Sequence, residues 1–215
     1  MTLAFAKSAM VLGADWPMGR VDAIFFHALS RDAVVTGSIN LFDFVADLYH
    51  RGVSENIVIN GSDGEKYGGN IPGESWAGKE EWVAALQERG IRGIRLAHPA
   101  FNTKEENDYF LAIAREKGWK NIGIVTVAYH FPRVMMGLVK SMERYGYYVA
   151  AYALMLKSLD WFASMHGSQG EHLSSAFGFI DGEIDRIPRY IDKGDLCTFE
   201  EFFAYLRMRN GYLSV

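Results

Sequence analysis

Cysteine is nearly absent from this sequence. One residue, Cys197, occurs among 215, which excludes an internal disulfide and any zinc site built from several cysteines. The histidines show neither H-E-x-x-H nor H-x-x-x-H spacing. The sequence therefore predicts no metal site.

The sequence also lacks an excess of positive charge and an apolar run long enough to span a membrane. The formal net charge is -4, with 49% apolar and 22% charged residues, which is typical of a globular protein in water. This charge gives no general attraction to nucleic acid or to anionic lipid. The first twenty residues show neither a secretory signal pattern nor a membrane span. We therefore expect a cytoplasmic protein that binds neither nucleic acid nor a membrane.

Three common site motifs are missing as well. The chain contains no G-x-G-x-x-G and no G-x-S-x-G, which argues against a standard dinucleotide fingerprint and a serine-hydrolase elbow. The segment "GESWAGKE" approaches a Walker A motif, but Glu80 stands where Ser or Thr would hold magnesium. We interpret this segment as a loop that leads into a helix.

The middle of the chain repeats one pattern four times. A charged helix end and a glycine precede an apolar, β-rich stretch in "HRGVSENIVIN", "ERGIRGIRLA", "EKGWKNIGIVTV" and "RYGYYVAAYAL". Glycine closes a helix by adopting the left-handed conformation, so we expect C-caps at Gly52, Gly90, Gly118 and Gly146. With the opening strand "VDAIFFHAL", the pattern predicts an α/β fold, a Rossmann-like three-layer sandwich with a mainly parallel sheet of about five strands.

The last quarter of the chain departs from this pattern. We expect a single domain over residues 1–215, with the Rossmann-like core at 20–156 and a helical extension at 157–215 packed on it. The extension should hold a helix interrupted by Pro188 and a final helix opened by a Thr198/Glu201 capping box. Its aromatic residues predict packing on the core or on a second copy, as a homodimer. They are Trp161, Phe162, Phe177, Phe179, Phe202, Phe203 and Tyr205.

Candidate binding residues lie just after the predicted strands. In parallel α/β sheets, ligands bind beyond the carboxyl ends of the strands, where the strand order reverses. The glycine-rich loop "GSDGEKYGGN" offers Gly61, Ser62 and Asp63, whose backbone amides could cradle an anion. His27 ends the first strand and would face the same crevice.

The segment "NTKEEN" supports two interpretations. Thr103 and Glu106 have the spacing of a capping box, in which two side chains satisfy free amides at a helix start. A capping box does not explain Asn102 and Asn107. Both a structural cap and a binding role therefore remain open.

The segment "TVAYHFPR" raises a similar question. Pro132 suits the first turn of a helix, which places His130 and Arg133 at the positive end of the helix dipole. A cation is favoured there only beside something negative, so Arg133 could clamp a phosphate or carboxylate. His130 could then move a proton near neutral pH. Alternatively, Arg133 forms a salt bridge with a nearby acid and His130 caps a carbonyl.

These pieces together resemble the DUF218 family, also described as ElyC/SanA/YdcF-like, over residues 21–154. "FNTKEEN" is similar to the family's Asn-Thr-x-x-Glu-Asn element, and "IVTVAYHFPRVMM" to its Val-Thr-x-x-x-His-x-x-Arg element. The resemblance implies a pocket lined by Asn102, Thr103, Glu106, Asn107, Thr126, His130 and Arg133. The chain departs from the family at "FFHALSRD", where a glycine-rich turn is usual, and the family's helical glutamate corresponds to Glu74 or Glu80.

The leading functional hypothesis is an enzyme, a hydrolase or transferase, that acts on a small anionic, phosphorylated or nucleotide-like ligand. His130 would be the catalytic acid or base. The resemblance also implies S-adenosylmethionine or another nucleotide-like molecule as a ligand. The alternatives are a non-catalytic module that senses such a molecule, and an interaction protein with a vestigial pocket.

Overall fold

The structure is a computed structural model that describes residues 1–14, 16–17, 19–36, 39–64, 76–156, 160–165 and 173–211. Its centre is a five-stranded sheet in the order β5-β4-β1-β6-β7, in which every neighbouring pair is parallel. The strands are β1 (Ala23–Phe26), β4 (Ile57–Ile59), β5 (Ile94–Leu96), β6 (Asn121–Val125) and β7 (Ala150–Ala153). The predicted α/β fold is confirmed, and it is consistent with a Rossmann-like sandwich.

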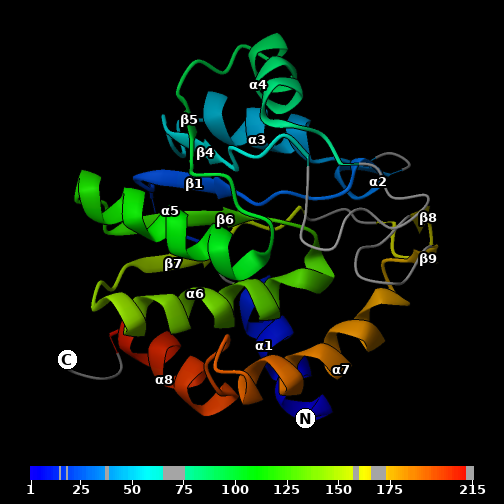
Figure 1. Cartoon of the computed structure of the whole chain (residues 1–215), viewed down its shortest axis with the longest axis vertical. Coiled ribbons are helices and arrows are strands. Elements are labelled where there is room, and N and C mark those ends of the chain that lie inside the picture. Colours follow the sequence, from blue (N-terminus) through cyan, green and yellow to red (C-terminus); the bar gives the residue numbers. More distant parts are fainter. Residues whose placement is uncertain are drawn as a thin grey trace.

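Helices cover both faces of this sheet (Figure 1). One face carries α3 (Leu41–His50) and α4 (Lys79–Glu88). The other carries α1 (Thr2–Gly13), α5 (Thr103–Lys117), α6 (Phe131–Tyr145) and α8 (Phe199–Arg209). The remaining elements are α2 (Arg31–Val34), β2 (Val35–Thr36), β3 (Ile39–Asn40), η1 (Ala128–His130), β8 (Ser164–Met165), β9 (Ser174–Ser175) and α7 (Phe179–Asp192).

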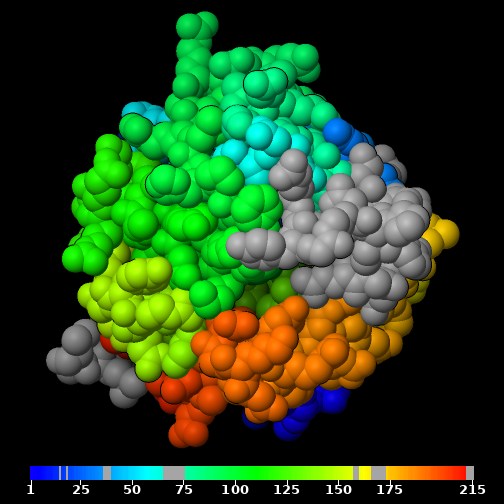
Figure 2. All heavy atoms as spheres, viewed as in Figure 1, coloured from blue at the N-terminus to red at the C-terminus, as the bar shows by residue number. Residues whose placement is uncertain are grey.

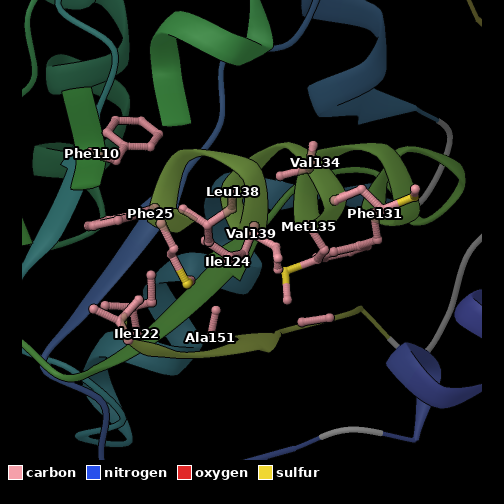
Figure 3. Close-up of a cluster of buried hydrophobic side chains, with 14 of the residues drawn as sticks. Phe25, Phe110, Ile122, Ile124, Phe131, Val134, Met135, Leu138, Val139 and Ala151 are labelled. Carbon is pink, nitrogen blue, oxygen red and sulfur yellow. The ribbon is translucent and has the colours of Figure 1, made fainter. Parts of the chain in front are cut away.

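Alternation along β1 divides the core into these two layers. Phe26 points toward α4 and lies 4.5 Å from the ring of Trp82, whereas Phe25 points the other way and lies 4.8 Å from the ring of Phe110 in α5. Figure 3 shows the second layer, where Leu138 and Val139 of α6 lie near Ile124 of β6. This arrangement buries β1 and β4 on both faces, as the central strands of a parallel sheet require, whereas the edge strand β5 is partly exposed.

The strand order reverses between β1 and β6. From β1 the chain adds β4 and β5 on one side, then crosses back to add β6 and β7 on the other. The crevice beyond the carboxyl ends of β1 and β6 is therefore the topological switch point of the sheet. His27 follows β1 there, and the stretch Thr126–His130 follows β6.

The predicted glycine C-caps are confirmed at Gly118 and Gly146, whereas Gly52 and Gly90 lie one residue beyond the C-caps Arg51 and Arg89. Gly52, Gly90, Gly118 and Gly146 all have positive φ, from 58° to 80°. These left-handed residues end helices α3, α4, α5 and α6 and turn the chain back toward the sheet.

The predicted capping box at the start of α5 is wrong. Asn102 is the N-cap, and its Oδ1 accepts a hydrogen bond from the Glu105 amide at 3.0 Å. Glu105 completes this cap by accepting from the Phe101 amide at 2.9 Å. Asparagine is as good an N-cap as threonine, so the helix starts one residue earlier than the Thr-x-x-Glu spacing indicates. Thr103 and Glu106 are thereby released for other contacts.

The extension packs beside α1 and α6 on one side of the sheet (Figure 1). The Thr198/Glu201 capping box of α8 is confirmed. The predicted interruption at Pro188 is wrong, because α7 runs unbroken through it. A proline costs about 3 kcal/mol inside a helix, and the burial of the apolar side chains of Phe179 and Ile187 on the core offsets that cost. The extension also contains the antiparallel pair β8–β9, so it is not wholly helical.

No helix in the described part of the chain has both the length and the apolarity needed to cross a bilayer.

Candidate functional site

A cavity of about 90 Å³ opens at the switch point. It lies between the loops after β1, β4, β5 and β6 and the first half of α7. Figure 2 shows a hollow between the green surface of the core and the orange surface of α7. The polar side chains that line it are Asn60, Ser62, Asn102, Thr103, Glu106, Tyr129, His130, Arg133, Glu183 and Arg186.

Asn60 fixes the loops at one end of this cavity. Its Oδ1 accepts from the amides of Ser62 and Ala100, both at 3.0 Å, and its Nδ2 donates to the Ala100 carbonyl at 2.8 Å. The same Nδ2 also lies 3.3 Å from Glu106 Oε1. A single amide thus ties the end of β4 to the loop after β5 and positions the carboxylate of Glu106.

Glu106 connects α5 to the end of β1. Its Oε1 accepts from the Ala28 amide at 2.9 Å, and its Oε2 lies 3.2 Å from His27 Nδ1. His27 is 1% exposed and packs edge-on against Phe110. His27 therefore lies behind the cavity wall, where it contacts Glu106 rather than the cavity itself.

His130 occupies the centre of the site, where η1 leads into α6. Its Nε2 lies 3.4 Å from Thr103 Oγ1, and its Nδ1 lies 3.4 Å from Glu183 Oε1. Burial lowers the pKa of His130 to about 4, with a further lowering by the positive charge of Arg133. The imidazole is therefore neutral at pH 7.

The carboxylate of Glu183 determines which tautomer His130 adopts. Burial by itself raises the pKa of Glu183, but the positive charge of Arg133 and the hydrogen bonds to the carboxylate outweigh it and hold that pKa well below its usual range. An ionised carboxylate only accepts hydrogen bonds, so Nδ1 of His130 carries the proton. Nε2 is then an acceptor directed at the Thr103 hydroxyl. Hydroxyl, imidazole and carboxylate stand in the order of a catalytic triad, with 3.4 Å at each of the two contacts.

Arg133 forms the salt bridge that the sequence left open as one of two roles. Its Nε and Nη2 donate to the two oxygens of Glu183 at 2.6 and 2.9 Å, and both side chains are buried. Arg186 lies 3.4 Å from the same carboxylate. The negative group that offsets a cation at the start of α6 is therefore Glu183, from the extension. Among the residues that the structure describes, the His130 side chain contacts Thr103 and Glu183 and caps no carbonyl.

Some of the other predicted site residues line the cavity and others lie away from it. Ser62, Asn102, Thr103 and Glu106 line the cavity, whereas Gly61, Asp63 and Thr126 do not. Asp63 pairs instead with Lys79, and the hydroxyl of Thr126 is buried without a partner among the described residues. Asn107 lines a neighbouring cavity. Glu80 lies in the first turn of α4, and Glu74 lies outside the described residues.

Sequence reasoning missed Asn60, Glu183 and Arg186. Asn60 had a detectable signal, because it is a polar residue directly after a buried strand. Glu183 and Arg186 had none, since they lie about fifty residues from Arg133 in a segment without the repeating pattern.

Metal and thiol chemistry find no support in the described residues. They contain no group of three His, Cys, Asp or Glu side chains arranged to hold a metal ion. Burial raises the pKa of Cys197 to about 12, so its thiol is protonated and unreactive at neutral pH.

When the chain is compared with protein-family models and with curated proteins, none of them matches it.

Proposed function

We propose that this chain is an enzyme, a hydrolase or transferase, that acts on a small anionic, phosphorylated or nucleotide-like ligand at the carboxyl edge of its sheet. The observation that carries the proposal is the row Thr103–His130–Glu183, which lines a cavity at the switch point. The resemblance to the DUF218 family supports the same location.

His130 is the general base and acid in this proposal. Its neutral Nε2 takes a proton from a hydroxyl or a water molecule beside Thr103, and Glu183 stabilises the imidazolium that forms. The same proton then passes from Nε2 to the leaving group. Arg133 keeps Glu183 ionised and in place through its paired hydrogen bonds, and so acts as a positioning residue.

The start of α5 supplies the contacts to the ligand. The first amides of a helix have no intrahelical acceptors, and they favour a negative charge. Asn102 and Thr103 hold this helix end at the cavity wall. The anion thus approaches α5 rather than Arg133, whose charge is already neutralised.

A two-part screen tests the proposal. Phosphate monoesters, nucleotides and S-adenosylmethionine are offered to the protein, with both thermal stability and product formation measured. A ligand at one hundred times its dissociation constant adds about 2.7 kcal/mol of stability, which a melting curve detects. We expect at least one anionic compound to stabilise the protein and to be turned over. Stabilisation without turnover would instead identify a non-catalytic sensing module. If no compound stabilises the protein and none is turned over, both the enzyme and the sensing module are refuted.

We also propose a homodimer, in which two exposed aromatic side chains of the extension form part of the interface. Phe162 and Phe177 are 75% and 58% exposed, and their ring centroids lie 5.7 Å apart. By contrast, Phe179 and Phe202 are buried in the core. Light scattering on the wild type and on the Phe162→Ser/Phe177→Ser variant tests this. A wild-type monomer would refute the dimer.

A further inference from the structure

A second and larger cavity adjoins the first. It has a volume of about 410 Å³ and lies between the start of α5, α6 and the end of α7. Asn102, Thr103 and Arg133 line both cavities, so the two are neighbours across these side chains. A volume of this size lies within the range of about 300–1,000 Å³ that is usual for small-molecule sites.

The charges of the two cavities differ. In the first, the carboxylates of Glu106 and Glu183 balance the guanidinium groups of Arg133 and Arg186. In the second, Lys104 and Lys193 contribute positive charge. Asp195 is the one carboxylate among the described residues that line it. An anion is therefore attracted more strongly to the second cavity than to the first.

Lys104 shares its acidic partner, Asp108, with a second cation. Its Nζ lies 3.3 Å from Asp108 Oδ2. That carboxylate already accepts from Arg144 Nη1, which lies 2.9 Å from each of its oxygens, and from the hydroxyl of Ser141. The single negative charge of Asp108 thus faces two positive charges, those of Lys104 and Arg144, so one positive charge remains in excess beside the start of α5.

Lys193 approaches the cavity from the end of α7. Its Nζ lies 5.2 Å from the centre of the Tyr190 ring, and no carboxylate in the described part of the chain pairs with it. Lysine binds phosphate as a compact charge with three donors. Lys104 and Lys193 come from different helices, so a group between them would be held from two sides.

Asn107 gives an independent indication of a ligand. It is fully buried and lines the second cavity. Its Nδ2 donates to the Val134 carbonyl at 3.1 Å, whereas its Oδ1 has no donor among the described residues. A buried acceptor without a donor is costly, and a hydroxyl or N–H group of a ligand would satisfy it.

We propose that the second cavity binds the phosphate group of a hydroxyl-bearing phosphate monoester, held by Lys104 and Lys193, while the uncharged reacting group of the ligand faces His130. The placement rests on the function proposed above, and it names the class of ligand. It also adds the two lysines to the start of α5 as the groups that recognise the anion.

The test uses inorganic phosphate and ribose 5-phosphate as probes, with ribose as the uncharged reference. Binding is measured by calorimetry at constant ionic strength. We expect ribose 5-phosphate to bind more tightly than phosphate, and ribose not to bind. Lys104→Ala and Lys193→Ala should each weaken ribose 5-phosphate binding about tenfold, because each removes a charged hydrogen bond. Lys193→Arg should retain most of the affinity.

Lys120→Ala is the matched control. Lys120 also lies over a tyrosine ring, that of Tyr147 at 4.0 Å, but it lines neither cavity. An equal loss in Lys120→Ala would overturn the subsite, as would the absence of phosphate binding to the wild type. If His130→Gln weakened phosphate binding and the lysine variants did not, the phosphate would lie in the first cavity. That result would refute the subsite and leave the proposed enzyme standing.

Discussion

Arg133 and Glu183 form a buried, two-pronged ion pair that joins the start of α6 to the C-terminal extension. The two hydrogen bonds measure 2.6 and 2.9 Å, and both residues are almost fully removed from water. This pair fixes the carboxylate that faces His130 and so connects the extension to the chemistry of the core.

Removing one member of this pair should destabilise the protein strongly. Glu183→Gln keeps the side-chain volume but leaves Arg133 buried without a counter-charge, which typically costs 3–5 kcal/mol. Urea unfolding measures the loss. Asp47→Asn is the control, because Asp47 pairs with Arg51 in the open at 3.0 Å, and exposed pairs contribute about 0–1 kcal/mol.

The double variant Arg133→Met/Glu183→Met completes this experiment. It removes both charges at once, so most of the lost stability should return. Similar costs for Glu183→Gln and Asp47→Asn would show that the buried pair does not form in solution.

The pH dependence of stability should reveal the lowered pKa of His130. Its pKa is about 4 in the folded protein and 6.5 in its ordinary state, so between these values the unfolded chain binds a proton that the native protein does not. The contribution of neutral His130 to the free energy of unfolding is complete above pH 6.5. This contribution falls by about 3 kcal/mol as the pH falls toward 4. The lowered pKa of Glu183 adds a loss of the same sign at lower pH.

The comparison variant is His130→Asn, which cannot titrate. Its unfolding free energy should change less between pH 6.5 and 4 than that of the wild type. Parallel curves for the two proteins would mean that His130 has the same pKa in the native and unfolded states, which would contradict a neutral imidazole in the native protein over this pH range.

The cap of α5 can be distinguished from its neighbour by two alanine variants. Asn102→Ala should cost about 1 kcal/mol, because Asn102 accepts from the Glu105 amide. Thr103→Ala should cost less, since Thr103 lies in the first turn and its hydroxyl contacts His130. Thermal unfolding at pH 7 gives both values, and the reverse order would restore Thr103 as the cap.

Gly61 should not tolerate a methyl group. A Cβ there would lie 2.2 Å from the Ala97 carbonyl oxygen, a backbone atom that cannot move aside freely. We expect Gly61→Ala to destabilise the protein by about 1–3 kcal/mol. Gly13→Ala is the matched control, because its Cβ would meet nothing within 4 Å. Equal melting temperatures for the two variants would contradict the close approach of the two loops.

The parts of the fold that depend on local chemistry could be predicted from the sequence. Gly118 and Gly146 end helices because glycine tolerates positive φ, and the apolar strand at 121–125 follows within a few residues. The cap at Asn102 was missed because two valid capping spacings overlap there. The unbroken helix at Pro188 was missed because packing on the core outweighs a local preference.

The site could be predicted only where it lies on the repeating core. His130 and Thr103 follow predicted strands, and the structure brings them within 3.4 Å. Glu183 could not be predicted, since its position depends on how α7 packs against α6, and no local pattern encodes that contact. Its presence decides between the two roles of Arg133 that the sequence left open.

The most direct measurement of the central claim compares turnover and affinity in His130→Gln. For the anionic compound that the wild type converts, kcat should fall at least a hundredfold, because proton transfer of this kind typically contributes 10²–10⁴-fold. The dissociation constant should stay within about threefold, since glutamine keeps a polar side chain in place of the imidazole. Unchanged kcat would contradict the role of His130 as acid and base and, with it, the account of this cavity as an active site.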